Sequence, residues 1–170
     1  MRMYHGSVNQ RYVGSISDGL AAGALIVAPA GDSVIVACDS TDAKAVERLA
    51  AITRLNLRRD DLTVYCADIS QAALHLRIDD TDFALIKDSA PGPARFELPV
   101  CGPLARQIKA RRTCGAVIPD DDITRAVAGA LGHPLLGVTA RWDDSDLDQT
   151  NTEAVAEYYG HGNIDFTIVC

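Results

Sequence analysis

The chain has 170 residues, of which 48% are hydrophobic and 23% charged, a composition typical of one globular domain and not of a disordered chain. A formal net charge of −7, from 16 basic and 23 acidic residues, argues against a protein whose overall field attracts nucleic acid. No apolar run approaches the roughly 20 residues of a membrane helix, and no secretory leader pattern is present. We therefore expect a cytoplasmic protein that does not bind a membrane.

Helical and strand patterns alternate along the first half of the chain. The spacing of Val13, Ile16 and Leu20 predicts a first helix. An unbroken apolar run then predicts a strand buried on both faces and ended by Pro29, with a turn at 30–32 before the next strand. The expected helices lie at 9–22, 41–53, from 69 onward and at 79–87, and the expected strands at 24–28, 33–38 and 62–66.

The same alternation continues through the second half. The acidic run 120–122 is expected to cap a helix that stops at Gly132, because carboxylates are favourable at a helix N-terminus. The expected strands lie at 94–98, 113–118, 134–139 and 164–169, and the expected helices at 103–110, 120–131 and 152–159. Strands that alternate with helices, many of them apolar on both faces, predict a single α/β domain over residues 1–170.

Generic catalytic and metal-binding motifs are absent from the sequence. It contains no Gly-rich dinucleotide fingerprint, no Walker A loop and no Gly-x-Ser-x-Gly elbow. The five cysteines and four histidines are scattered, without a Cys-x-x-Cys or His-x-x-x-His pair. The carboxylates at 120–122 could hold magnesium, but a helix N-terminus explains them without a metal. We therefore predict no metal site.

Basic side chains gather in two places, and guanidinium groups suit the forked contacts that bind phosphates. One cluster follows the second expected helix and the other lies on and after a short helix; they comprise Arg54, Arg58 and Arg59, and Arg106, Lys109, Arg111 and Arg112. Surface arginines that balance an acidic chain are the simpler interpretation. A functional interpretation requires both clusters to face one cleft.

Several short segments fall in a characteristic order: LIVAP at 25–29, LTVYC at 62–66, PGP at 91–93, LGHPL at 131–135 and IDFTI at 164–168. Together they resemble the YrdC/YciO superfamily, the threonylcarbamoyl-AMP synthase fold, and in particular its YciO branch. The resemblance implies a single domain with a twisted mixed sheet flanked by helices. We expect this chain to lack the last hairpin of the family. It also implies enzymes that join threonine, bicarbonate and ATP, with magnesium, into threonylcarbamoyl-adenylate for tRNA modification.

The polar residues that this chemistry needs are replaced at most matching positions. Ala30 and Asp32 stand at the two threonines of the family's Pro-Thr-Asp-Thr motif. Ala51 and Thr53 stand at its Lys-x-Arg pair, with Arg54 as a displaced substitute. Each lost hydrogen bond to a charged group costs about 1.5–3 kcal/mol. Since about 1.4 kcal/mol corresponds to a tenfold change in reaction rate, several such losses lower the rate by several orders of magnitude.

Further replacements follow in the second half. Arg95 stands at the threonine after Pro-Gly-Pro, Val117 at an arginine, and Thr139 and Arg141 at the ends of the family's Ser-Ala-Asn motif. Arg95 and Arg141 either bind a different anion or pair with Asp32 and fill the old pocket. The ligand-binding candidates are Ala30, Asp32, Ser33, Arg54, Arg58, Arg59, Thr63, Arg95, Thr139 and Arg141.

The sequence therefore predicts a catalytically degenerate family member, a pseudoenzyme that binds a nucleotide or another anionic ligand at the cleft; whether enzymatic activity survives stays open. One alternative is an active synthase whose cations have moved. A second is a module that binds double-stranded RNA or tRNA through the basic cluster at 106–112. A third is a structural homodimer that pairs through the strand at 164–169, because an exposed strand edge invites pairing.

Overall fold

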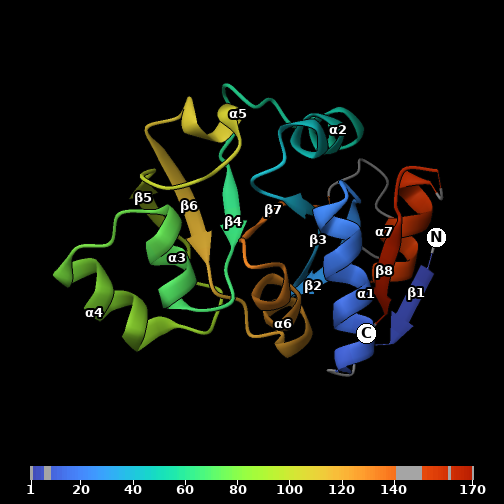
Figure 1. The fold of residues 1–170 in the computed structure, drawn as a ribbon, viewed down its shortest axis with the longest axis horizontal. Helices are drawn as coiled ribbons and strands as arrows, with labels where there is room; N and C mark the ends of the chain where they lie inside the picture. The colour runs from blue at the N-terminus through green and yellow to red at the C-terminus, as the bar shows by residue number, and fades with distance from the viewer. Residues whose placement is uncertain (1, 6–8, 141–150, 161, 170) are drawn as a thin grey trace.

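The computed structural model describes residues 2–5, 9–140, 151–160 and 162–169, which form an eight-stranded sheet flanked by helices (Figure 1). The strands are β1 (Arg2–His5), β2 (Ile26–Ala30), β3 (Ser33–Asp39), β4 (Thr63–Tyr65), β5 (Phe96–Pro99), β6 (Thr113–Val117), β7 (Leu135–Thr139) and β8 (Phe166–Val169). The helices are α1 (Gln10–Ala21), α2 (Ala43–Thr53), α3 (Ile69–His75), α4 (Asp80–Ser89), α5 (Arg106–Lys109), α6 (Asp122–Leu131) and α7 (Thr152–Tyr159).

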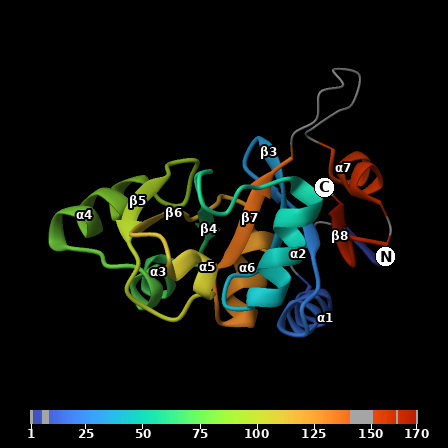
Figure 2. The ribbon, with the colours of Figure 1, turned by 90° about the horizontal axis from the view of Figure 1, so that it is seen from above.

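The sheet is mixed, which confirms the predicted fold class. Its strand order is β1-β8-β2-β3-β7-β4-β6-β5. β8 runs parallel to both β1 and β2, and β4 runs parallel to β6. The remaining neighbours are antiparallel. Seen from above, α7, β1 and β8 lie at one end of the sheet and α4 extends from the other end (Figure 2).

Alternating side chains build two apolar layers, one on each face of the sheet. Along β3, Val34, Val36 and Cys38 pack toward α2, α3 and α5, whereas Ile35 and Ala37 pack toward α1 and α6. This period of two is the ordinary geometry of a strand that is covered on both faces. Among the residues of β5 and β6, only Val117 belongs to the layer beneath α1 and α6, whereas Glu97, Pro99 and Thr113 on the same face are exposed. This face is therefore open around Glu97 and Thr113.

Local signals explain most element boundaries. The Asn9 side chain accepts a hydrogen bond from the Arg11 backbone N–H and begins α1, and Asp42 caps α2 in the same way. α6 ends at Gly132, whose φ of 81° favours glycine. These helix boundaries agree with the predicted ones.

The prediction that Pro29 ends its strand is wrong. β2 continues through Pro29, which pairs with Val34, to Ala30. Because β8 pairs with β2 only at Ile26 and Val27, no strand of the described residues pairs with Pro29 on the side away from β3. An edge position tolerates the missing backbone N–H of proline.

The prediction that residues 164–169 offer a free strand edge is also wrong. Strand β1, which the sequence analysis did not anticipate, pairs with β8 over its whole length, so β8 lies between β1 and β2. The edge strands of the described sheet are β1 and β5. No helix within the described ranges is both long and apolar enough to span a bilayer.

Candidate functional site

A cavity of about 350 Å³ lies where the β2–β3 turn meets the start of α6 and the Pro-Gly-Pro loop. This volume is near the lower end of the roughly 300–1,000 Å³ typical of small-molecule sites. We call it the cleft. Its lining residues are Ala30, Gly31, Asp32, Ser33, Tyr65, Gly92, Pro93, Val117, Pro119, Asp120 and Thr139.

The start of α6 holds one wall of the cleft in place. The Gly31 backbone N–H donates to Asp121 Oδ2 at 2.7 Å, and the Thr124 hydroxyl donates to the Pro29 carbonyl at 2.7 Å. Gly31 has a φ of 63°, which a tight turn between two strands requires. The predicted capping role of the 120–122 run is therefore only partly correct: Asp121 occupies the N-cap position, but its side chain makes no capping bond and reaches across to the turn.

Tyr65 and Thr139 form the floor of the cleft. The Tyr65 ring lies across Gly137, where an added Cβ would come within 2.6 Å of Tyr65 Cε2. The Tyr65 side chain is hydrogen-bonded to that of Thr139. Burial raises the pKa of Tyr65, and the Thr139 bond and nearby Arg95 offset part of that rise, so the phenol stays protonated at neutral pH. The sequence analysis missed Tyr65 because an aromatic residue in a buried strand has the pattern of a core residue.

The charge of the lining is acidic. Asp32 and Asp120 bring two carboxylates, Ser33, Tyr65 and Thr139 bring hydroxyls, and no lysine, arginine or histidine is among the described residues that line the cleft. Of the ten ligand-binding candidates, Ala30, Asp32, Ser33 and Thr139 lie in this lining. Arg141 lies outside the described residues.

Arg95 adjoins the cleft but is bound elsewhere. Its Nε donates to Thr63 Oγ1 at 2.9 Å, its Nη2 to the Leu62 carbonyl at 3.0 Å, and its Nη1 forms an ion pair with Glu97 at 2.6 Å. The predicted alternative that Arg95 pairs with Asp32 is therefore wrong, because its carboxylate partner is Glu97. Glu97 lies on β5, two residues after Arg95, and its side chain points to the same face, so it reaches the guanidinium first. The Thr63 hydroxyl accepts a hydrogen bond from Arg95, and Thr63 does not line the cleft.

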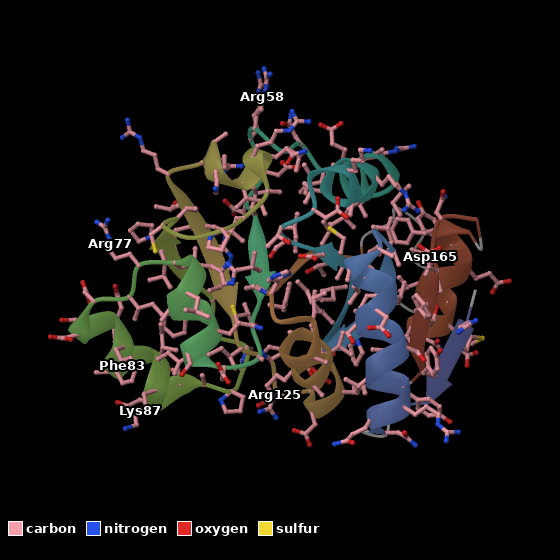
Figure 3. The ribbon with its side chains drawn as sticks, viewed as in Figure 1. Arg58, Arg77, Phe83, Lys87, Arg125 and Asp165 are labelled. Atoms are coloured by element: carbon pink, nitrogen blue, oxygen red, sulfur yellow. The ribbon has the colours of Figure 1, made fainter. Side chains whose placement is uncertain are left out.

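The loop arginines do not line the cleft either. Arg54 ends α2 with a left-handed φ of 58°, and Arg58 and Arg59 are exposed in the loop before β4. Figure 3 shows Arg58 pointing outward, away from the sheet. The expectation that Arg54, Arg58 or Arg59 replaces the lost cations of the cleft is not met in this structure.

The two basic clusters meet at one end of the molecule. The Arg111 guanidinium donates to the carbonyls of Leu57 and Asp60, at 2.9 and 2.8 Å, and so fastens the loop after α2 to the turn after α5. Arg106 pairs with Glu47 on α2 at 3.4 Å. Lys109 and Arg112 are exposed beside them. This basic end does not contribute to the cleft lining.

The described acidic residues do not converge on a magnesium site. No cluster of three or more His, Cys, Asp or Glu side chains among the described residues has the geometry to hold a metal ion. Asp121 is engaged by Gly31, and Asp122 forms an ion pair with Arg125.

Comparison with known proteins gives the family. A family model for Sua5, YciO and YrdC, described as "Telomere recombination", matches residues 18–169. The chain therefore belongs to the Sua5/YciO/YrdC family, as its sequence resemblance predicted.

Individual relatives agree with this assignment. An uncharacterised protein of Haemophilus influenzae is 28% identical over 145 residues, which are 84% of this chain and 70% of that protein. The crystal structure of Escherichia coli YciO has a TM-score of 0.83 at 26% identity and covers 98% of this chain and 82% of its own. The crystal structure of P. abyssi Sua5 complexed with L-threonine has a TM-score of 0.84 at 19% identity, a likeness in fold alone. This chain is matched over 99% of its length but spans only 49% of that Sua5 chain.

Proposed function

We propose that this chain does not make threonylcarbamoyl-adenylate and that its cleft binds a small polar ligand that is uncharged or cationic. The observation that carries the proposal is the acidic lining, with Asp32 and Asp120 and no described cation. The sequence alone predicts an anionic ligand. We propose an uncharged or cationic ligand instead because the expected cations do not line the cleft; these are Arg54, Arg58, Arg59 and Arg95.

The chemistry of the lining favours a ligand rich in hydrogen-bond donors. An ionised carboxylate only accepts hydrogen bonds, whereas a hydroxyl both donates and accepts. Asp32 and Asp120 together with Ser33 and Thr139 therefore present more acceptors than donors. Amino and hydroxyl groups, such as those of a nucleoside or an amine, match this surface.

A triphosphate is disfavoured by the same lining. Two unit charges 4 Å apart repel by about 1 kcal/mol in water and by about 4 kcal/mol at an effective dielectric constant of 20. A synthase must also hold the triphosphate with cations, and each missing charged hydrogen bond costs about 1.5–3 kcal/mol. Both effects act against ATP, so the energetic balance supports loss of the synthase reaction.

A calorimetric series tests the sign of the ligand charge. Adenosine, AMP and ATP with magnesium share the nucleoside and differ in phosphate number. L-Threonine, which P. abyssi Sua5 binds in its crystal structure, carries an ammonium and a hydroxyl together with a carboxylate. The proposal expects affinity to stay level or fall as phosphates are added. Affinity that increases tenfold or more from adenosine to ATP would contradict it.

A turnover assay tests the reaction itself. The chain is incubated with threonine, bicarbonate, ATP and magnesium, with an active Sua5 as the positive control. We expect no pyrophosphate above background from a folded sample. Release of pyrophosphate that requires both threonine and bicarbonate would show that the synthase activity survives.

A second candidate function is RNA binding at the basic end. The observation that favours it is the pair of Arg111 hydrogen bonds to the loop after α2, which brings the two predicted basic clusters together. Arg58, Arg59, Lys109 and Arg112 are all exposed in these segments. Arginine and lysine side chains on one surface supply the sequence-independent attraction to phosphates.

Fluorescence anisotropy with a labelled RNA duplex tests this second candidate at low and at physiological salt. Reversal of charge at Arg58 and Arg112, as Arg58→Glu and Arg112→Glu together, should weaken binding at least tenfold. Arg11→Glu, which reverses an exposed arginine in the first turn of α1, is the matched control and should change binding little. No binding even at low salt would exclude the RNA function.

A further inference from the structure

We infer that Arg95 and Thr113 form a carboxylate-binding site on the open face of the sheet and that the chain's own Glu97 occupies it. The two oxygens of Glu97 have separate donors. Arg95 Nη1 pairs with Oε2 at 2.6 Å, and the Thr113 hydroxyl donates to Oε1 at 2.6 Å. A guanidinium and a hydroxyl that each take one oxygen form a two-point site for a carboxylate.

The guanidinium is positioned without help from Glu97. Thr63 Oγ1 and the Leu62 carbonyl accept hydrogen bonds from Nε and Nη2, at 2.9 and 3.0 Å. The group also lies directly over Gly115, where an added Cβ would collide with Arg95 Nε. Because these contacts come from Leu62, from Thr63 at the start of β4 and from β6, the cation keeps its place when the β5 carboxylate is removed.

The site is accessible to a small anion. The side chains of Arg95 and Glu97 are 32% and 46% exposed, on the face that α1 and α6 leave open. Partial burial acts to raise the pKa of Glu97, but hydrogen bonds from Thr113 and Arg95 outweigh it and lower the pKa. Glu97 is therefore ionised at neutral pH and neutralises the guanidinium.

The occupied site affects the charge beside the cleft. Arg95 follows the cleft residue Pro93 by two positions and acts electrostatically on Tyr65, which lines the floor. With Glu97 in place, this cation is compensated and unavailable to a ligand carboxylate or phosphate. In this respect the inference rests on the proposed function: Glu97 is the residue that keeps the neighbourhood of the cleft closed to anions.

Chemical rescue tests the site. In Glu97→Ala, formate at 100 mM replaces the missing carboxylate, with sodium chloride of equal ionic strength as the reference. If formate binds with a dissociation constant of about 10 mM, mass action favours the folded state about elevenfold and raises Tm by about 3–6 °C. The wild type, whose site is occupied, and the double variant Arg95→Ala/Glu97→Ala, which lacks the cation, should show no shift of this kind.

An equal effect of formate on all three proteins would overturn the inference, because it would be a general salt effect. If Glu97→Ala does not fold, Glu97→Ser serves, because its short side chain also leaves the site empty, and formate must again raise its Tm beyond the wild-type shift; an equal shift overturns the inference. Its failure is distinguishable from that of the proposed function. Rescue by formate together with tight ATP binding by the wild type would retain the carboxylate site and reject the acidic-cleft proposal.

Discussion

Replacement of Gly137 by alanine perturbs the floor of the cleft directly. Gly137 lies in β7 under the Tyr65 ring, and an added Cβ would lie 2.6 Å from Tyr65 Cε2 and 3.0 Å from Ile35 Cδ1. Tyr65 is only 8% exposed and Ile35 is fully buried. The substitution therefore overpacks the layer beneath α1 and α6 and pushes the Tyr65 ring toward the cleft.

The expected cost has two parts. Overpacking a buried position costs about 1–3 kcal/mol. Displacement of the ring also breaks the Tyr65–Thr139 hydrogen bond, which contributes about 0.5–1.5 kcal/mol. The total is about 1.5–4.5 kcal/mol of unfolding free energy, and at about 2–4 °C per kcal/mol it lowers Tm by about 3–18 °C.

Thermal and urea unfolding of Gly137→Ala measure this loss, and Gly129→Ala is the matched control. Gly129 lies in α6, where an added Cβ would be 3.7 Å from Ala67 Cβ, an ordinary contact. The same substitution there should stabilise the helix, by about 0.5–1 kcal/mol. In a double-mutant cycle, Tyr65→Ala should relieve part of the Gly137→Ala cost. Wild-type stability of Gly137→Ala would refute the placement of Tyr65 in the cleft.

Three further predictions follow from the charges. Asp32→Asn and Asp120→Asn should each strengthen ATP binding about fivefold, since each removes about 1 kcal/mol of repulsion, and should leave adenosine binding unchanged. Calorimetry that finds unchanged or weaker ATP binding in both variants would contradict the acidic-cleft account. Burial lowers the pKa of His75, so the unfolded chain takes up its proton first as the pH falls below about 6.5. Unfolding free energy should therefore decrease between pH 7 and 5, and His75→Gln should show a flatter profile in urea unfolding; parallel profiles would exclude this role. Arg111→Ala should cost about 1–2 kcal/mol, through the loss of two partly exposed hydrogen bonds, and should speed hydrogen exchange in the loop after α2; unchanged exchange would show that this loop is held by other contacts.

The sequence predicted the regular elements well where their signals are local. The Asp42 cap and the Gly132 end of α6 are set by side-chain and backbone chemistry within a few residues. Strand β1 was missed because four residues carry too short a pattern, and its stability comes from pairing with β8 at the far end of the chain. The Pro29 error has the same origin, since only the sheet order shows that Pro29 lies beyond the reach of β8.

The cleft could be predicted in part. Ala30, Asp32, Ser33 and Thr139 were found through the order of motifs, which places the ends of β2 and β7 at one site. The fate of Arg95 could not be predicted, because its choice between Asp32 and Glu97 depends on which face of the sheet each side chain occupies. An arginine that matches a ligand-binding position in sequence can therefore be fully engaged by its own chain.

The most direct test of the account compares adenosine with magnesium ATP on the wild-type chain by titration calorimetry at low salt. The account predicts that ATP binds no more tightly than adenosine, because the described lining offers carboxylates where a triphosphate needs cations. A dissociation constant for ATP that is ten times lower than that for adenosine, or lower still, would show that cations do serve the cleft.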